Sequence, residues 1–379
     1  MITVQEINDV GELRESRAAW NALLSQTAAA SFFQSLDWLQ VYWRHFGVDK
    51  RLRVLIARAD GQAIGIVPLI VRRQRRRLGT VRVLTYPLDD WGSFYGPIGA
   101  NPTWALSSAL DHIRRTERDW DLLELPWVDV LGSDGGCTLR AFQQVKMPVS
   151  VEAWQTAALV DLSAFGSWPS YWATRTSRWR NNVRRSEKKL GETGDVSYVR
   201  YRPGGADQGD ADPRWDWYDE CERIAQASWQ GDSSTGTTLT HESIRPFLRD
   251  CHRAATEAGS LDLNLLLLDG RPVAFNYAYH LDGYVFGLRT GYDPQATSEG
   301  AGSVLHGRMI DDCFARGDHT YDLGTGYLEC KRYWLTDVRS SYRYTHFSAG
   351  APWAQLVRAK RGVQRWFGKR KRRPVGDAI

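Results

Sequence analysis

The chain has 379 residues, of which 42% are hydrophobic and 25% are charged, and its formal net charge is +5 at pH 7. This composition is typical of a soluble globular protein, and the length is sufficient for two domains. Since no apolar run approaches the roughly 18–20 residues that span a bilayer, the sequence excludes a transmembrane helix.

The N-terminal residues 1–6 have no basic segment followed by an apolar one, so they do not resemble a signal peptide. The five cysteines are scattered and include no Cys-x-x-Cys pair, which argues against a disulfide framework or a zinc site. We therefore expect a cytoplasmic protein that binds no metal.

The first predicted elements form a hairpin from Leu52 to Arg72, in which Asp60-Gly61 separates two apolar runs. Asp-Gly between hydrophobic runs indicates a tight turn, because both turn positions favour positive φ. A helix over 104–118 and a strand over 119–125 follow.

Two helical patterns occupy the middle of the chain. Residues 168–190 carry a dense run of Arg and Lys, and residues 216–229 are amphipathic. The segment 203–213 between them is rich in Gly and Asp and predicts a surface loop.

The hairpin pattern then recurs from Leu261 to His280 around Asp269-Gly270, and a second turn at Asp282-Gly283 leads into another strand. A helix over 303–316 and a strand over 318–324 follow. Hairpin, helix and strand thus occur twice, which predicts a tandem duplication of one α/β unit. We expect two domains, 1–150 and 151–350, and a separate tail, 351–379.

The second copy contains a glycine-paired loop that the first copy lacks. Residues 298–303 read Ser-Glu-Gly-Ala-Gly-Ser and open the helix, and free N–H groups at a helix start suit a pyrophosphate. The alternative is a plain N-cap turn with Ser303 as the cap. The corresponding loop of the first copy, 94–102, is longer and contains prolines, so we expect any cofactor to bind the second domain.

Four segments carry a family resemblance: Phe33–Trp38 (F-x-S-x-x-W), Trp179–Arg185 (R-x-N-x-R-R), Ser228-Trp229 with Gly236-Thr237 (S-W…G-T), and the core from Tyr292 to Lys331. They resemble the GCN5-related N-acetyltransferase (GNAT) superfamily. More narrowly they resemble its tandem-domain, cellulose-biosynthesis-type branch, which is related in fold to the Fem peptidyltransferases. The resemblance covers roughly residues 30–347. It implies two GNAT-like domains, each a mixed, mostly antiparallel sheet flanked by helices, with an acyl-CoA donor and an amine acceptor.

The resemblance also assigns the cofactor site. The end of the strand at Thr290, Gly291 and Tyr292 would present backbone N–H groups to the thioester carbonyl and pantetheine. The pyrophosphate would bind Glu299, Gly300, Ala301, Gly302 and Ser303, and Lys331 is a further candidate for a phosphate or an anionic acceptor.

For the proton transfer, Asp322 at the end of a strand and Glu329 in the next loop are the candidate carboxylates. Asp322 has an alternative structural role as the anchor of the loop 324–326, and Glu329 is equally consistent with a surface carboxylate. The family often has Tyr-Lys where this chain has Cys330-Lys331, so we add nearby Tyr327 as a candidate acid.

The acceptor is expected in a cleft between the domains. Asp90 and Trp91 would face that cleft and could recognise a cationic acceptor, and the equally consistent alternative is a plain turn. Arg289, a charge inside an apolar strand, would meet an acceptor carboxylate. Three further candidates for acceptor binding are Trp229, Arg180 and Asn181.

The positive charge is concentrated in the tail. Residues 351–379 contain nine Lys or Arg and one Asp, which is +8 and leaves −3 for residues 1–350. Six apolar side chains recur there at helical spacing: Trp353, Leu356, Val357, Val363, Trp366 and Phe367. A basic amphipathic helix suits an anionic membrane surface, and the alternative is a helix docked on the body.

The leading prediction is an acyl-CoA-dependent N-acyltransferase that acts on a small molecule, an amino sugar or a precursor in polysaccharide biosynthesis. One alternative is a Fem-like transferase that uses aminoacyl-tRNA, although the Gly-x-Gly loop favours CoA. The other is a non-enzymatic membrane-surface protein of polysaccharide synthesis. The sequence has no hydrolase, kinase or metal-site motif and gives no indication of oligomeric state.

Overall fold

The computed structural model describes residues 2–76, 79–228, 230, 231, 233, 238–295 and 300–371, with the side chains of Ile2, Arg76 and residues 365–371 left aside. The predicted site residues Trp229 and Glu299 lie outside the described residues.

In the described residues, twelve strands form one sheet in the order β1-β2-β3-β4-β5-β12-β6-β11-β10-β9-β8-β7. Their bounds are β1 Ile2–Ile7, β2 Lys50–Ala59, β3 Gln62–Arg76, β4 Gly79–Thr85, β5 Leu122–Val128, β6 Ser150–Asp161, β7 Val196–Tyr201, β8 Leu261–Leu268, β9 Arg271–Leu281, β10 Tyr284–Tyr292, β11 Thr320–Thr325 and β12 Asp337–Phe347. Only β4–β5 and β10–β11 pair in parallel. The predicted mixed, mostly antiparallel architecture flanked by helices is confirmed.

The helices flank this sheet in two sets. The first half contains α1 Arg17–Leu24, α2 Leu36–Phe46, α3 Pro102–Arg115 and α4 Cys137–Gln144. The second contains α5 Trp168–Ala173, α6 Ser177–Thr193, α7 Trp215–Ala227, α8 Arg245–Glu257, α9 Ala301–Arg316 and α10 Leu328–Lys331, and α11 Pro352–Lys371 follows. Short 3₁₀ turns lie at Glu12–Ser16, Phe32–Gln34 and Ala206–Gln208.

The three predicted Asp-Gly turns are confirmed, and all three Asp residues have φ between 46° and 50°. The helical pattern over 168–190 is interrupted, which the sequence did not predict. α5 ends at Ala173 and α6 begins at Ser177, because Thr176 Oγ1 accepts a hydrogen bond from Trp179 N and caps a new helix.

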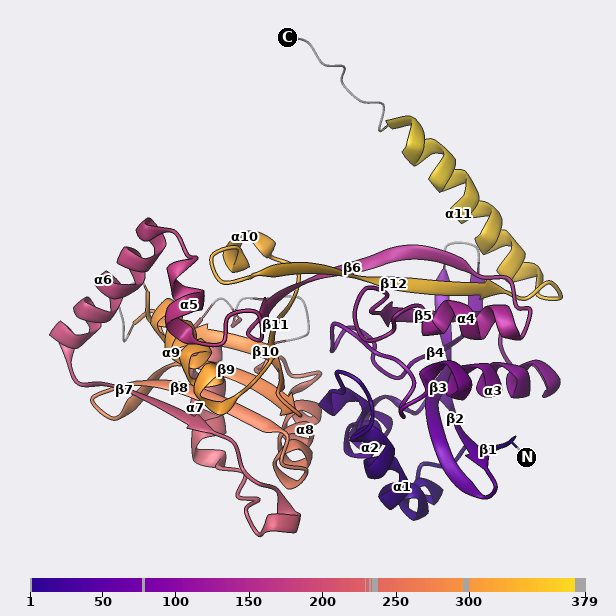
Figure 1. Ribbon diagram of the computed structural model, residues 1–379, viewed down its shortest axis with the longest axis horizontal. Helices are drawn as coiled ribbons and strands as arrows, with labels where there is room; N and C mark the ends of the chain where they lie inside the picture. The colour runs from indigo at the N-terminus through magenta and orange to yellow at the C-terminus, as the bar shows by residue number, and fades with distance from the viewer. Residues whose placement is uncertain are drawn as a thin grey trace.

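The two halves exchange a strand. β6 follows the first half along the chain but pairs with β11 of the second, while β12 at the end of the second half pairs with β5 of the first. β6 and β12 also pair with each other and run together across the top of the molecule in Figure 1. The predicted domain boundary at residue 150 stays a prediction. β12 lies after this boundary in the sequence but pairs with β5, which lies before it.

Aromatic side chains join the halves in a shared core. The ring centroids of Phe33 and Phe286 are 4.9 Å apart, and those of Trp38 and Phe247 are 5.5 Å apart. The five cysteines all lie in the described part of the chain and are free thiols, as the sequence predicted.

Each half also buries an arginine at its sheet edge. Arg53 on β2 bonds Glu6 on β1 at 2.7 Å and Asp119 at 3.0 Å. In the second half Arg200 on β7 bonds Asp262 on β8 at 2.6 Å, with Asp318 at 3.4 Å. Asp119 precedes β5 and Asp318 precedes the equivalent strand β11. The other charges are exchanged: in the first half the carboxylate is on the edge strand β1 and the arginine on β2, whereas in the second half the arginine is on the edge strand β7 and the carboxylate on β8.

The beginning of α11 is docked on the first half. Ala354 and Val357 join a small apolar cluster with Val81, Val83 and Leu122. Figure 1 shows the later turns of α11 projecting away from both halves.

Candidate active site

The parallel strands β10 and β11 separate in the middle of the second half. Three residue pairs are in register, from Tyr284 with Thr320 to Phe286 with Asp322, and the pairing then stops. Gly287 stands at this point, and β10 has a bulge between Gly287 and Arg289 where it pairs with β9. A Cβ at Gly287 would lie 2.9 Å from Tyr321 Oη, so this position requires glycine. We call the stretch beyond Gly287, where β10 and β11 are no longer paired, the gap.

Asp322 lies on one side of this gap and is fully buried. Its Oδ2 accepts a hydrogen bond from Tyr284 Oη at 2.6 Å, and its Oδ1 accepts one from Gly324 N at 2.7 Å. Burial raises the pKa of Asp322, while these two hydrogen bonds oppose the rise. Tyr284 and the loop at Gly324 therefore each occupy one carboxylate oxygen.

Lys331 on α10 reaches back to the same loop. Its Nζ donates to Gly324 O at 3.0 Å and to Thr325 O at 2.9 Å. Burial lowers the pKa of Lys331 from 10.5 to about 8, against the opposing effect of Asp322. Half of the Lys331 amines are therefore uncharged at a pH of about 8. The uncharged amine still has two N–H groups, so it donates both hydrogen bonds in either protonation state.

The other wall of the gap is the end of β10. Gln230 Nε2 donates to Thr290 O at 3.1 Å, so this carbonyl faces away from β9. Because N–H and C=O of one residue share a side in an antiparallel strand, the Thr290 N–H also faces the gap. Sequence reasoning missed Gln230, although it directly follows the Ser228-Trp229 motif.

The start of α9 lies beside this strand end. Gly300 has φ of 114°, and a Cβ there would lie 2.2 Å from Ser186 Oγ on α6. A Cβ at Gly302 would meet only the ring of Tyr292, at 3.8 Å. Among the described residues no side chain caps this helix, and Gly300 O accepts the N–H groups of Ser303 and Val304. The predicted residues from Gly300 to Ser303 and from Thr290 to Tyr292 are thus brought together.

The equivalent gap in the first half is filled by the chain itself. β4 and β5 pair only at Val83–Leu122 and Leu84–Leu123. Beyond them the buried residue Tyr95 donates its N–H to Trp127 O at 2.9 Å. That the first half has no cofactor site stays a prediction.

Two of the predicted catalytic residues lie on the surface. The side chain of Glu329 is 85% exposed and pairs with Arg332 at 2.6 Å. Tyr327 is 79% exposed and precedes α10 with φ of 48°.

The predicted acceptor residues are dispersed. Trp91 is buried beside Phe247, with the guanidinium of Arg289 5.8 Å from its ring centroid. Asp90 is exposed. Arg180 donates to Ala173 O at 3.0 Å and so completes the end of α5, while Asn181 is exposed on α6.

A cavity of about 50 Å³ lies between the halves and is lined by Ser31, Ser93, Asp129, Tyr284, Phe286 and Arg339 among others. This volume accommodates water and not an amine substrate.

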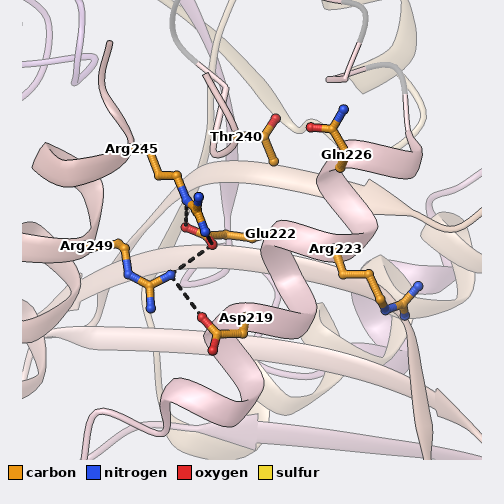
Figure 2. Close-up of a pocket in the computed structure, with 7 residues that line it drawn as sticks. All are labelled: Asp219, Glu222, Arg223, Gln226, Thr240, Arg245 and Arg249. Carbon is orange, nitrogen blue, oxygen red and sulfur yellow. Dashed lines mark hydrogen bonds and ion pairs between the residues drawn. The ribbon is translucent and has the colours of Figure 1, made fainter. Parts of the chain in front are cut away.

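A larger polar pocket of about 500 Å³ lies between α7 and α8. Figure 2 shows the carboxylate of Glu222 between Arg245 and Arg249, with Arg223 pointing away from this cluster. Arg223 on α7 donates a hydrogen bond to Asp293 Oδ2 at 2.7 Å and so connects α7 to the end of β10. None of the site residues predicted from the sequence is among the described residues that line this polar pocket.

Three solved structures resemble the whole chain. FemX is 12% identical with a TM-score of 0.60, over 94% of this chain and 99% of that one. The C-terminal domain of a putative lysylphosphatidylglycerol synthetase from Agrobacterium fabrum is 12% identical with a TM-score of 0.55, over 92% and 95%. L-PGS from Bacillus licheniformis is 12% identical with a TM-score of 0.53, over 92% and 96%. No curated protein matches the sequence.

Residues 177–332 match the model of the acetyltransferase (GNAT) domain. By this match residues 177–332 are a GNAT-type domain, and the whole chain shares its fold with FemX, so the resemblance predicted from the sequence is confirmed. The matched residues include α9, the gap between β10 and β11, and Lys331. Among the described residues, none of the helices has the length and apolar character to cross a membrane.

Proposed function

We propose that the protein transfers an acyl group from acyl-CoA to an amine at the gap between β10 and β11. The observation that carries the proposal is the parting of these strands after Phe286 and Asp322, beside the start of α9, which no described side chain caps. In the first half the same gap is closed by Tyr95. When bound, acyl-CoA supplies the acyl group as a thioester.

The residues present fit such a donor. Backbone N–H groups at Ala301 and Gly302 begin a helix and suit the pyrophosphate, and the position of Gly302 leaves room for it. The Thr290 N–H faces the gap and suits the charge that develops on the carbonyl oxygen.

Lys331 is our candidate general base. An acceptor amine is protonated at neutral pH and must lose a proton before it attacks. Both oxygens of Asp322 are engaged, and Glu329 is exposed in an ion pair. Uncharged Lys331 keeps its hydrogen bonds to the two carbonyls, and its lone pair is free to accept the proton of the acceptor amine. Asp322 positions Lys331 indirectly, because both side chains bind Gly324.

The donor is tested by the thermal stability of the full chain with acetyl-CoA, since a ligand that binds only the folded state raises the melting temperature. We expect a rise that Gly302→Asp abolishes. Thr103→Asp, the same change in charge at the start of α3, is the matched control and should keep the rise. An unchanged rise in Gly302→Asp would refute the site.

The second candidate is transfer from aminoacyl-tRNA, favoured by four exposed basic residues on α6: Arg184, Arg185, Lys188 and Lys189. Binding of tRNA should then weaken steeply with salt. A protein that binds neither acetyl-CoA nor tRNA would support the non-enzymatic alternative. Within the leading proposal, the acceptor is an amine of a small molecule, an amino sugar or a polysaccharide precursor in the cytoplasm.

A further inference from the structure

Helix α11 has two faces with different environments. One face is docked: Ala354 and Val357 are buried against β4 and β5, and Arg361 donates to Glu124 at 2.7 Å. These contacts fix the helix to the first half.

The other face is largely exposed and mostly apolar, and the ring of Trp353 at its beginning also lies beside Gly79 of β4. Trp353, Leu356 and Val363 are 44%, 47% and 54% exposed. Their spacing of three and seven residues puts them on one side of the helix. Lys360 is exposed between them. We call Trp353, Leu356, Lys360 and Val363 the outer stripe.

We propose that the outer stripe of α11 binds the surface of an anionic lipid bilayer. From Pro352 to Lys371 the sequence contains seven Lys or Arg and no acidic residue. Apolar side chains that include Trp, combined with many cations, are the features with which a helix lies in a membrane interface. Each cation near an anionic surface adds to the attraction.

Charge argues against a second copy of this helix as the occupant. Two α11 helices would each bring seven cations to one contact, and like charges repel. Nucleic acid would satisfy the cations but would leave Leu356 and Val363 without an apolar partner. A bilayer interface satisfies both. Since the docked face holds α11 on β4 and β12, binding would also fix the orientation of the first half on the membrane.

The test is co-sedimentation of the full chain with vesicles of phosphatidylcholine alone or mixed with phosphatidylglycerol at 3:1. We expect binding to the mixed vesicles only. The double variant Leu356→Asn/Val363→Asn should bind at least about tenfold more weakly. The matched control is Val48→Asn/Leu131→Asn, which removes two apolar side chains that are 92% and 78% exposed elsewhere and should bind like the parent.

A chain that ends after Gln364 retains the docked turns and loses six basic residues and one acidic residue of the tail, so its binding should fall at least about a hundredfold. Circular dichroism and the acetyl-CoA shift should be unchanged in every variant, which separates this proposal from the proposed function. Equal binding to both kinds of vesicle, or undiminished binding by the double variant, would overturn the proposal. A dimer of the parent that the double variant breaks into monomers would assign the stripe to self-association instead.

Discussion

Asp322 and Lys331 hold the same residue from opposite sides. Asp322 Oδ1 accepts the N–H of Gly324 at 2.7 Å, and Lys331 Nζ donates to the C=O of Gly324 at 3.0 Å. The buried carboxylate therefore fixes the loop that in turn orients the amine. In the proposed mechanism Asp322 is therefore a positioning group, and Lys331 is the group that exchanges a proton.

The first prediction concerns pH. If Lys331 accepts the acceptor's proton, kcat/KM should rise with pH through about 8, the pKa of Lys331. Lys331→Arg stays protonated, so it should lose roughly 10²–10⁴-fold in rate. The measurement is the release of CoA thiol from acetyl-CoA with a panel of primary amines. Near-normal activity of Lys331→Arg would mean that the residue acts only as a cation.

The second prediction compares two glycines at the start of α9. Gly300→Ala should destabilise the fold by more than about 1 kcal/mol, because a side chain is strained at φ of 114° and its Cβ would overlap Ser186. Gly302→Ala should be neutral or slightly stabilising, since its Cβ meets only Tyr292 at 3.8 Å. Urea unfolding of both variants measures the difference, and equal stabilities would contradict the packing of α6 on α9.

The third prediction concerns the buried ion pairs. Asp262→Ala would leave Arg200, only 1% exposed, without its main partner, which should cost about 3–5 kcal/mol of unfolding free energy. Asp37→Ala removes a pair with Arg17, whose side chain is 41% exposed, and should cost less than about 1 kcal/mol. A similar cost for the two variants in urea unfolding would show that the network contributes no more than a surface pair.

The fourth prediction concerns acid stability. His252 is buried, and burial lowers its pKa from 6.5 to about 4, although hydrogen bonding to Pro213 O opposes the shift. The unfolded chain binds this proton more readily, so stability should fall as the pH drops from about 6.5 to about 4, by up to roughly 3 kcal/mol. His252→Gln should flatten this part of the pH profile. An equally steep profile in the variant would assign the loss to other groups, such as His280, whose pKa burial also lowers to about 4.

Most elements of the fold could be predicted from local sequence patterns. Asp-Gly turns and apolar periodicity placed the hairpins and the helices α3, α7 and α9, because these signals depend on neighbouring residues. The exchange of β6 and β12 was not predictable, since it depends on pairing between residues nearly 200 positions apart along the chain, such as Tyr342 and Ala153. Arg289 was visible as a charge inside an apolar strand, whereas the buried arginines Arg53 and Arg200 and their partners were not predicted.

The candidate site was predictable in part. Glycine spacing indicated the loop that opens α9, and the resemblance to the GNAT superfamily indicated the strand end at Thr290. The sequence did not show that Asp322 is fully buried or that Lys331 reaches Gly324, since burial and a lowered pKa arise only when distant segments pack. Trp91 was expected in a cleft, but the neighbouring ring of Phe247 from the second half buries it.

The exchanged strand β12 also determines when the molecule can form. β5 belongs to the first half, yet one of its neighbours in the sheet is close to the end of the chain. During synthesis at about 5–20 residues per second, β5 must wait on the order of 10–40 s for β12 to emerge. Until then an edge of β5 remains unpaired and open to association with other chains. The nascent first half therefore exposes one sheet edge until β12 has been synthesised.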